Sequence, residues 1–211
     1  MSTPDPTAAR ARWDERYGTE GFVFGVEPNQ FVAEHLASVP PGRALDLGSG
    51  QGRNAVWLAS RGHRVTAVDL SPVATEQAQR LAAEAGVAAD FVTADLAVWT
   101  PEPGAFDMVL LSYVHLEPGP RRVVHAMAVD ALAPGGMVFL IAHHKDNIEL
   151  GVGGPQRPEL LLTEEDLVVD FAAVTIERLE RVVRPVVDGD TTRHALDVLL
   201  IGRQRGEAPN R

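Results

Sequence analysis

Apolar and polar residues alternate along this chain in two different periods. From about residue 43 onward, short continuous apolar runs, typical of buried strands, are separated by stretches in which apolar residues recur at helical spacing. One such stretch carries Ala74, Ala78 and Leu81 on one face, and Gly86 follows as a stop signal. Strands that alternate with helices predict β-α-β units and hence a parallel sheet. The expected strands are 43–47, 64–68, 89–93, 106–112 and 137–142.

The final third of the chain has a different pattern. The segment Thr163-Glu164-Glu165-Asp166 is a capping-box-like signal and predicts a helix that ends near Phe171. Two longer strand-like runs follow, over 174–183 and 194–201, and the Asp188-Gly189-Asp190 sequence between them is typical of a hairpin turn. The parallel sheet is therefore expected to end in an antiparallel pair of strands.

The residues ahead of the first strand predict two short helices. The first covers Thr7 to Tyr17, and the second begins after Asn29, a favourable N-cap residue, and ends before Pro40. The polar ends of the chain, 1–6 and 204–211, show no periodicity and are expected to be irregular. We expect a single domain over residues 1–211, with an N-terminal helical lid segment at 1–36 and a Rossmann-like α/β core at 43–203.

Composition and charge narrow the range of functions. The 211 residues suffice for one α/β domain, and a formal net charge of −10 argues against a protein that binds nucleic acid or an anionic membrane through phosphates. The chain has no cysteine, which excludes disulfides, thiolate metal sites and a cysteine nucleophile. No apolar run approaches the roughly 20 residues that span a bilayer, and no signal-peptide pattern is present. We expect a cytoplasmic protein without a resident metal.

The candidate chemistry centres on the loop after the first strand. Its sequence, Asp46-Leu47-Gly48-Ser49-Gly50-Gln51-Gly52-Arg53-Asn54, runs from a buried strand through a glycine-rich turn into a helix. Glycines let the backbone approach a ligand closely, and the helix start offers N–H groups and a positive dipole end to a small anion. A dinucleotide fingerprint, G-x-G-x-x-G, would place its third glycine where Arg53 stands. For such a loop taken alone, a tight turn without a ligand is the alternative.

The D-x-G-x-G-x-G pattern from Asp46 to Gly52 resembles the first motif of class I S-adenosylmethionine-dependent methyltransferases. The resemblance implies a doubly wound, seven-stranded sheet in the order 3-2-1-4-5-7-6, mostly parallel, with an antiparallel C-terminal hairpin. Within this class, Leu-Asp-Leu-Gly-x-Gly-x-Gly-Arg-Asn is similar to small tellurite-resistance and thiopurine methyltransferase-like proteins. Those proteins also begin with a Trp/Tyr-bearing helix, here Trp13 to Tyr17, and usually have a cysteine where Ser49 stands, a near-isosteric change.

Acidic residues at the ends of the second and third strands agree with the resemblance. Asp69 stands where a carboxylate can accept hydrogen bonds from both ribose hydroxyls; capping the next helix is its alternative role, although Ser71 already suits that position. Asp95 ends the third strand, where the resemblance implies an acid beside the adenine amino group. The residues that the resemblance assigns to S-adenosylmethionine and its product S-adenosylhomocysteine are Tyr17, Asp46, Gly48, Ser49, Gly50, Gly52, Asn54, Asp69, Leu70, Asp95, Leu96 and Ser112.

Histidines gather where the fourth and fifth strands are expected to end. His115 follows the fourth strand, and His143 and His144 follow the fifth. A hydroxyl or amine acceptor would need a base, for which a histidine with a pKa of about 6–7 is suitable, whereas an anionic or soft acceptor would need only positioning. His115 and His143 are the candidate catalytic residues, with structural or solvent-facing roles as the alternative. The candidate acceptor-binding residues are Trp13, Tyr113 and His144.

These residues predict a methyltransferase that moves a methyl group from S-adenosylmethionine to a small molecule by in-line displacement, with no nucleic-acid or membrane partner. The aromatic N-terminal segment and the loop from Gly151 to Gln156 could cover the donor, although an ordinary flexible connection is the alternative for that loop. Two other functions stay open: a nicotinamide-dependent reductase, which the glycine spacing disfavours, and a non-catalytic donor-binding regulatory or assembly protein. The sequence leaves the acceptor and the oligomeric state open.

Overall fold

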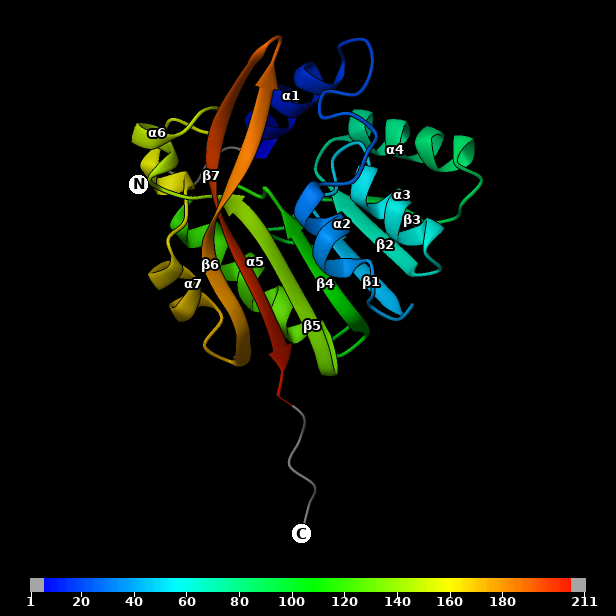
Figure 1. Cartoon of the computed structure of the whole chain (residues 1–211). Coiled ribbons are helices and arrows are strands. Elements are labelled where there is room, and N and C mark those ends of the chain that lie inside the picture. Colours follow the sequence, from blue (N-terminus) through cyan, green and yellow to red (C-terminus); the bar gives the residue numbers. More distant parts are fainter. Residues whose placement is uncertain (1–5, 206–211) are drawn as a thin grey trace. The chain divides into compact units, whose positions relative to one another are not determined.

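The computed structural model describes residues 6–205, so the irregular ends expected at 1–5 and 206–211 lie outside the described residues. Pro6 begins the first helix and Gln204 ends the last strand, so regular structure extends slightly further than predicted at both ends. The described residues contain a seven-stranded sheet in the order β3-β2-β1-β4-β5-β7-β6, which confirms the predicted order (Figure 1). The chain divides into two compact units, residues 1–100 and 101–211, which are described in turn.

The first unit contains three parallel strands and four helices among its described residues, and its strands begin and end within one residue of the prediction. Asn29 caps α2 by accepting hydrogen bonds from the N–H groups of Phe31 and Val32, as expected of this residue. Ser71 caps α4 in the same way. The elements are α1 (Pro6–Tyr17), α2 (Gln30–Leu36), β1 (Arg43–Leu47), α3 (Arg53–Ser60), β2 (Arg64–Asp69), α4 (Pro72–Glu84) and β3 (Asp90–Thr93).

One glycine of the loop between β1 and α3 is required by packing. Gly52 has a φ of +84°, and a Cβ built on it would lie 2.6 Å from the Cβ of Ala78 on α4. Any side chain at this position would therefore push α3 away from α4 and strain the backbone as well. The loop that the sequence marks for a ligand thus also packs closely against α4.

The second unit continues the sheet with β4 and β5 in parallel and ends in the antiparallel strands β7 and β6. The short α6 and the 3-10 turn η1 were not predicted, because elements of one turn show no periodicity. The elements are β4 (Phe106–Ser112), α5 (Pro118–Asp130), β5 (Leu132–His143), α6 (Asn147–Leu150), η1 (Pro158–Leu160), α7 (Glu164–Asp170), β6 (Val174–Asp188) and β7 (Thr191–Gln204).

Strand β5 begins five residues earlier than the predicted Met137. Phe106 pairs with Leu132 and Met108 pairs with Met137, so residues 133–136 lie opposite Asp107 alone in a bulge. A Cβ on Gly136 would lie 2.9 Å from the carbonyl oxygen of Ala133. The proline and glycines of this segment therefore form an irregularity inside the strand.

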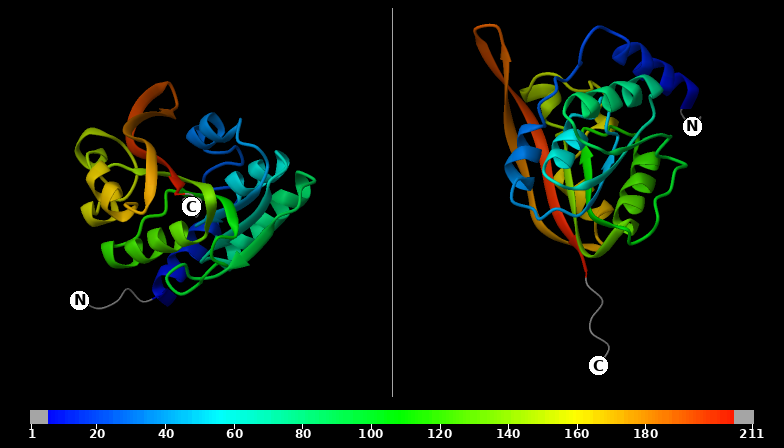
Figure 2. Two further views of the ribbon diagram at one scale, coloured as in Figure 1. Left: turned by 90° about the horizontal axis from the view of Figure 1, so that it is seen from below. Right: turned by 90° about the vertical axis from the view of Figure 1, so that its right-hand side faces the viewer.

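The hairpin of β6 and β7 is longer than predicted. Pairing of β5 with β7 ends at His143 and Asp197, whereas β6 and β7 stay paired as far as Asp188 and Thr191, around a turn at Gly189. Figure 2 shows the tip of the hairpin standing clear of the other elements of the second unit. The prediction stopped short at Arg184 and Pro185 in β6 and left out the polar residues 191–193 in β7. No helix within residues 6–205 has the length and apolar character to cross a membrane.

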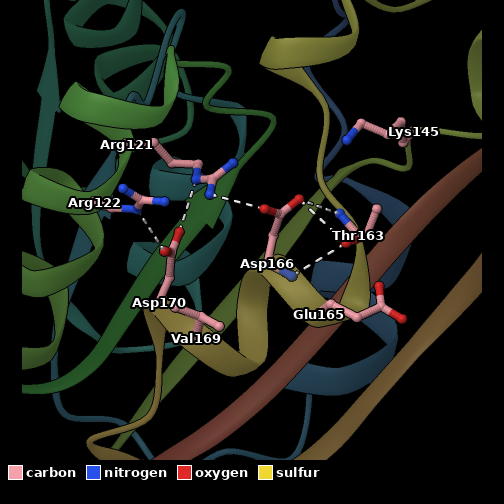
Figure 3. Close-up of a pocket in the computed structure, with 8 residues that line it drawn as sticks. All are labelled: Arg121, Arg122, Lys145, Thr163, Glu165, Asp166, Val169 and Asp170. Carbon is pink, nitrogen blue, oxygen red and sulfur yellow. Dashed lines mark hydrogen bonds and ion pairs between the residues drawn. The ribbon is translucent and has the colours of Figure 1, made fainter.

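A buried ion cluster joins α5 to α7 (Figure 3). The Arg121 side chain, 6% exposed, donates a hydrogen bond from Nε to Asp170 at 2.8 Å and one from a terminal nitrogen to Asp166 at 3.2 Å. His125 Nδ1 lies 2.9 Å from the same Asp170 oxygen that Arg121 contacts. Asp166 also completes the capping box with Thr163 that the sequence predicted. The cluster therefore fixes the start of α5 to both ends of α7.

Replacing Asp170 by asparagine should lower the free energy of unfolding by about 3–5 kcal/mol, because the buried Arg121 loses its closer carboxylate. Urea denaturation measures this change. Arg122→Gln is the matched control: its guanidinium lies 3.8 Å from the other Asp170 oxygen with a side chain 66% exposed, so it should cost less than about 1 kcal/mol. Equal losses for the two variants would contradict the importance of burial.

Candidate functional site

The glycine loop of the first unit has the backbone conformation that the sequence predicted. Gly48, Gly50 and Gly52 all have positive φ. The N–H groups of Gly48 and Ser49 both donate to the carbonyl oxygen of Val68, at 2.8 and 3.0 Å. The loop is therefore joined to the end of β2 by its own backbone.

Asp69 organises the same loop from the end of β2. One carboxylate oxygen accepts the N–H of Gly50 at 2.7 Å, and the other accepts the N–H of Ser71 at 2.9 Å. Burial raises the pKa of Asp69, although these two hydrogen bonds oppose the shift. Ser71 caps α4, so capping is not the role of Asp69. A carboxylate offers about four lone-pair sites, so Asp69 keeps the capacity to accept from a ligand as well.

Asp46 is a buried carboxylate at the end of β1. It is 1% exposed, and neither of its oxygens has a hydrogen-bond partner among the described residues. Burial, together with the charge of Asp69, raises the pKa of Asp46 to about 7, with Arg53 opposing. An unpaired buried carboxylate is costly, so this position favours a ligand that brings a positive charge or hydrogen-bond donors.

Tyr17 covers the glycine loop. Its side chain is 5% exposed and stacks on Trp13 with ring centroids 5.4 Å apart. A Cβ built on Gly50 would lie 2.9 Å from the Tyr17 hydroxyl oxygen. Burial raises the pKa of Tyr17, with the charge of Asp69 adding to the effect, so the hydroxyl stays protonated. The end of α1 thus lies over the loop, and the role of residues 1–36 as a lid stays a prediction.

Two glutamines that the sequence reasoning did not single out hold this cover in place. Gln51 accepts the N–H of Val23 at 2.8 Å and donates to the carbonyl oxygen of Gly21 at 3.2 Å. Gln77 donates to the carbonyl oxygen of Tyr17 at 2.9 Å and accepts from Gln51 at 2.8 Å. The sign of this contact in the sequence was Gln51 itself, a polar residue between two glycines of the loop.

Asn54 contacts the protein in a way that was not predicted. Its side-chain oxygen accepts the N–H of Asn29 at 2.8 Å, and the residue is 5% exposed. This contact favours a structural role over the predicted contact with a cofactor. Gly52, the N-cap of α3, has no side chain to bond the first N–H groups of that helix, so the backbone there is available to an anionic group.

A shallow pocket of about 240 Å³ opens where β2 and β3 end. Two of its residues, Leu70 and Asp95, were predicted from the sequence. One Asp95 oxygen accepts the N–H of Ala97 at 2.9 Å, and Leu96 beside it is buried. Thr7 and Arg10 of α1 were not predicted, because the sequence pointed only to Trp13 and Tyr17 of that helix. The pocket is lined by Thr7, Arg10, Leu70, Thr93, Ala94 and Asp95.

In the second unit, Tyr113 and the two candidate catalytic histidines, His115 and His143, lie together at the ends of β4 and β5. His143 Nδ1 lies 3.1 Å from His115 Nε2, and the Tyr113 ring lies 4.8 Å from the His143 ring. Tyr113 has a φ of +58°, which is uncommon for a residue with a side chain, and its N–H donates to the carbonyl oxygen of Ile141. Such backbone strain is concentrated at functional sites.

Two residues of the hairpin complete this cluster and were not predicted. The Tyr113 hydroxyl donates to Asp197 at 2.7 Å, and Arg184 Nε donates to the same oxygen at 2.7 Å. Asp197 is fully buried. The Ser112 hydroxyl is buried without a hydrogen-bond partner among the described residues, and its contact with a donor stays a prediction. Sequence patterns gave no reason to pair strand ends with residues so much later in the chain.

The histidine pair has a lower basicity than expected. Burial, together with His143, lowers the pKa of His115 to about 3, with Asp197 opposing. Burial and the charge of Arg184 lower the pKa of His143 to about 4. Both rings are therefore neutral at physiological pH, and neither has the pKa of about 6–7 that suits a general base.

His144 makes its hydrogen bonds to other residues than this pair. Its Nδ1 accepts the N–H of Asp146 at 3.1 Å, so Nε2 carries the proton and donates to Glu164 at 3.0 Å. Both ring nitrogens are thus engaged, which favours a structural role over acceptor binding. Within residues 6–205, no three His, Asp or Glu side chains form a group that could hold a metal ion.

Because of Asp46, the free energy of unfolding should fall as the pH rises. The folded state keeps a proton up to about pH 7, whereas the unfolded carboxyl loses it near its ordinary value of 3.8, so stability declines across that window and levels off above it. Asp46→Asn removes this decline. At pH 8 it should gain up to about 4 kcal/mol over the native chain, and near pH 4 almost nothing.

Denaturant unfolding at several pH values measures the difference between the two proteins, which cancels the other titrating groups. Asp90→Asn, at the exposed start of β3, is the matched control and should run parallel to the native chain. A gain for Asp46→Asn that does not vary with pH would rule out the raised pKa.

Comparison with known proteins agrees with this geometry. Residues 44–136 match the sequence model of a family described as methyltransferase domain. The ubiquinone biosynthesis O-methyltransferase of Xanthomonas campestris pathovar campestris is 34% identical over 143 residues, which cover 64% of this chain and 58% of that protein. The chain thus matches little more than half the length of this relative.

Solved structures resemble this chain over nearly its whole length. TehB from Haemophilus influenzae has a TM-score of 0.71 at 16% identity, with 93% of this chain and 67% of TehB covered. The N-methyltransferase NodS from Bradyrhizobium japonicum, solved with S-adenosyl-L-homocysteine, has a TM-score of 0.73 at 18% identity, with 95% and 99% covered. Residues 44–136 therefore match a methyltransferase domain, and the chain has the fold of the class I S-adenosylmethionine-dependent methyltransferases.

Proposed function

We propose that this chain is an enzyme that transfers a methyl group from S-adenosylmethionine to a small molecule. The observation that carries the proposal is the buried carboxylate of Asp46, which has no hydrogen-bond partner among the described residues and stands directly ahead of the glycine loop. A cation on this loop would provide the missing partner, and S-adenosylmethionine carries an ammonium and a sulfonium. A nicotinamide dinucleotide brings an anionic pyrophosphate instead, which the same carboxylate repels.

The first unit contains suitable groups for each part of the donor. Asp69 can accept from the ribose hydroxyls through the lone pairs that Gly50 and Ser71 leave unused. The pocket beside Leu70 and Asp95 suits an adenine ring. The uncapped start of α3 suits the donor's own carboxylate.

The donor supplies a methyl group on a positively charged sulfur, which leaves as a neutral thioether and needs no acid. The protein's task is therefore to hold the acceptor in line and to exclude water. Tyr17 and Trp13 exclude water above the loop, and Tyr113 with the histidine pair is the proposed surrounding of the acceptor. Rings with pKa values of about 3 and 4 are weak bases, which favours positioning over deprotonation.

The match to an O-methyltransferase supports oxygen as the acceptor atom in this proposal. A donor-binding protein without catalysis remains the alternative, because it would use the same first unit. The two differ in turnover: only the enzyme forms S-adenosylhomocysteine when an acceptor is present. A panel of small carboxylates, phenols, amines and thiols, followed by the release of S-adenosylhomocysteine, tests the proposal.

Asp69→Asn should weaken the binding of S-adenosylmethionine by about 1.5–3 kcal/mol, roughly ten- to a hundred-fold, because a charged acceptor of hydrogen bonds is lost. Titration calorimetry measures the affinity. Asp90→Asn removes the same charge at an exposed position and should bind normally. Unchanged affinity in a folded Asp69→Asn protein would remove Asp69 from the donor site, and failure of the native chain to bind S-adenosylmethionine would refute the proposed function itself.

A further inference from the structure

Three side chains of the second unit form a line of hydrogen bonds. A terminal nitrogen of Arg184 on β6 lies 3.5 Å from Nε2 of His143, and Nδ1 of His143 lies 3.1 Å from Nε2 of His115. The direction of these bonds follows from the groups themselves, because a guanidinium has N–H donors and no acceptor. Arg184 therefore makes Nε2 of His143 an acceptor.

The positions of the ring protons on His143 and His115 can then be assigned one after the other. A neutral imidazole carries one proton, so that of His143 lies on Nδ1 and is donated to His115 Nε2. His115 accepts at Nε2 and so carries its own proton on Nδ1. The line that begins at Arg184 ends in an N–H donor on His115.

Asp197 and Tyr113 hold the guanidinium at the head of this line. Arg184 Nε donates to Asp197 at 2.7 Å and to the Tyr113 hydroxyl oxygen at 2.9 Å. Although burial opposes it, the pKa of Arg184 is raised by Tyr113 and Asp197, so the guanidinium stays charged. The fully buried Asp197 thus balances a permanent cation beside the histidines.

Gly154 restricts the His143 ring from the other side. It has a φ of +73°, and a Cβ built on it would lie 2.6 Å from His143 Cδ2 and 2.9 Å from His143 Nε2. Only a residue without a side chain lets the loop lie against the ring so closely. The loop from 151 to 156 therefore helps to keep Nε2 directed at Arg184.

The pair cannot keep a proton taken from an acceptor. The groups that face it are the cation of Arg184 on β6, the carboxylate of Asp197 on β7 and the hydroxyl of Tyr113 after β4. Burial dominates over all of these and leaves pKa values of about 3 for His115 and about 4 for His143. Above about pH 5 both rings are neutral donors.

We propose that Arg184 is a positioning residue that makes the histidine pair a hydrogen-bond donor, and that Nδ1–H of His115 holds an acceptor whose oxygen is already ionised. The inference rests on the proposed methyl transfer and specifies its substrate class. That class is a carboxylate or an acidic hydroxyl, which reaches the site as an anion. Alcohols and protonated amines, which would have to lose a proton to the protein before the transfer, are excluded.

The imidazole nitrogen chemical shifts of labelled histidine test the positioning role without donor or acceptor. Both His143 and His115 should be neutral and protonated on Nδ1 from about pH 5 to about 8. Arg184→Met should mix the two tautomers. Because that variant leaves Asp197 buried without its cation, Arg184→Met/Asp197→Asn is measured beside it, and Asp197→Asn alone, which keeps Arg184, should retain the native tautomers.

Two results would overturn the positioning role: an Nε2-protonated His115 in the native chain, or unchanged tautomers in both variants that lack Arg184. The anion preference has its own probe. Benzoate at millimolar concentration should shift the His115 Nδ1 signal, whereas benzamide, a neutral molecule of the same shape, should not. No shift with benzoate, or equal shifts with both molecules, would overturn the preference for an anion.

Turnover separates this inference from the proposed function. Carboxylates and acidic phenols should be methylated in preference to alcohols and amines, and Arg184→Met should raise KM for the anionic acceptor about ten-fold or more with a smaller effect on kcat. Arg184→Lys, which restores the charge, should recover part of the loss. Preference for an amine or alcohol would overturn the inference and leave methyl transfer intact. Absence of S-adenosylhomocysteine with every acceptor would overturn the proposed function, and with it the acceptor class, while the tautomers still decide the role of Arg184.

Discussion

The hydrogen bond from the Gly50 N–H to the Asp69 carboxylate fixes the conformation on which the rest of the first unit depends. It holds the middle of the loop in a conformation with positive φ. In this conformation the Gly50 backbone packs against the Tyr17 side chain. The bond also keeps a second buried carboxylate close enough to raise the pKa of Asp46. The unit therefore contains two buried carboxylates close together, and a cation beside them would relieve an electrostatic penalty that the fold itself creates.

Much of the fold and of the first unit's site could be predicted, because the signals are local. Apolar runs mark the strands, and the ends of parallel strands share one edge, so Asp69, Leu70 and Asp95 lie at the same edge, where Leu70 and Asp95 line a pocket. The contacts of Gln51 and Asn54 could not be predicted in the same way. Each bonds to backbone in an irregular segment more than twenty residues earlier, and such segments carry no period that would fix their position.

In the second unit, the positions of the two histidines could be predicted from the sequence, but their pKa values could not. The meeting of His115 and His143 followed from strand order, and the structure confirms it. Their low pKa values could not be predicted, because the pKa of an imidazole depends on how far all of its neighbours in the folded protein shield it from water. Arg184 and Asp197 were missed for a related reason: cross-strand neighbours in a hairpin are set by register, and composition does not reveal register.

That register has a consequence for how such a protein can diverge. Beyond the end of β5, β6 and β7 pair only with each other, so the turn at Gly189 and the cross-strand contacts alone align the two strands there. Side chains alternate between faces, so a slip of a single residue would turn Arg184 to the face opposite Asp197. Small changes in the length or turn residues of the hairpin tip would therefore redirect the Arg184 side chain. The glycine loop would keep its own sequence and fold. Under the proposed function, changes in this short ribbon would alter the choice of acceptor and leave the residues proposed to bind the donor unchanged.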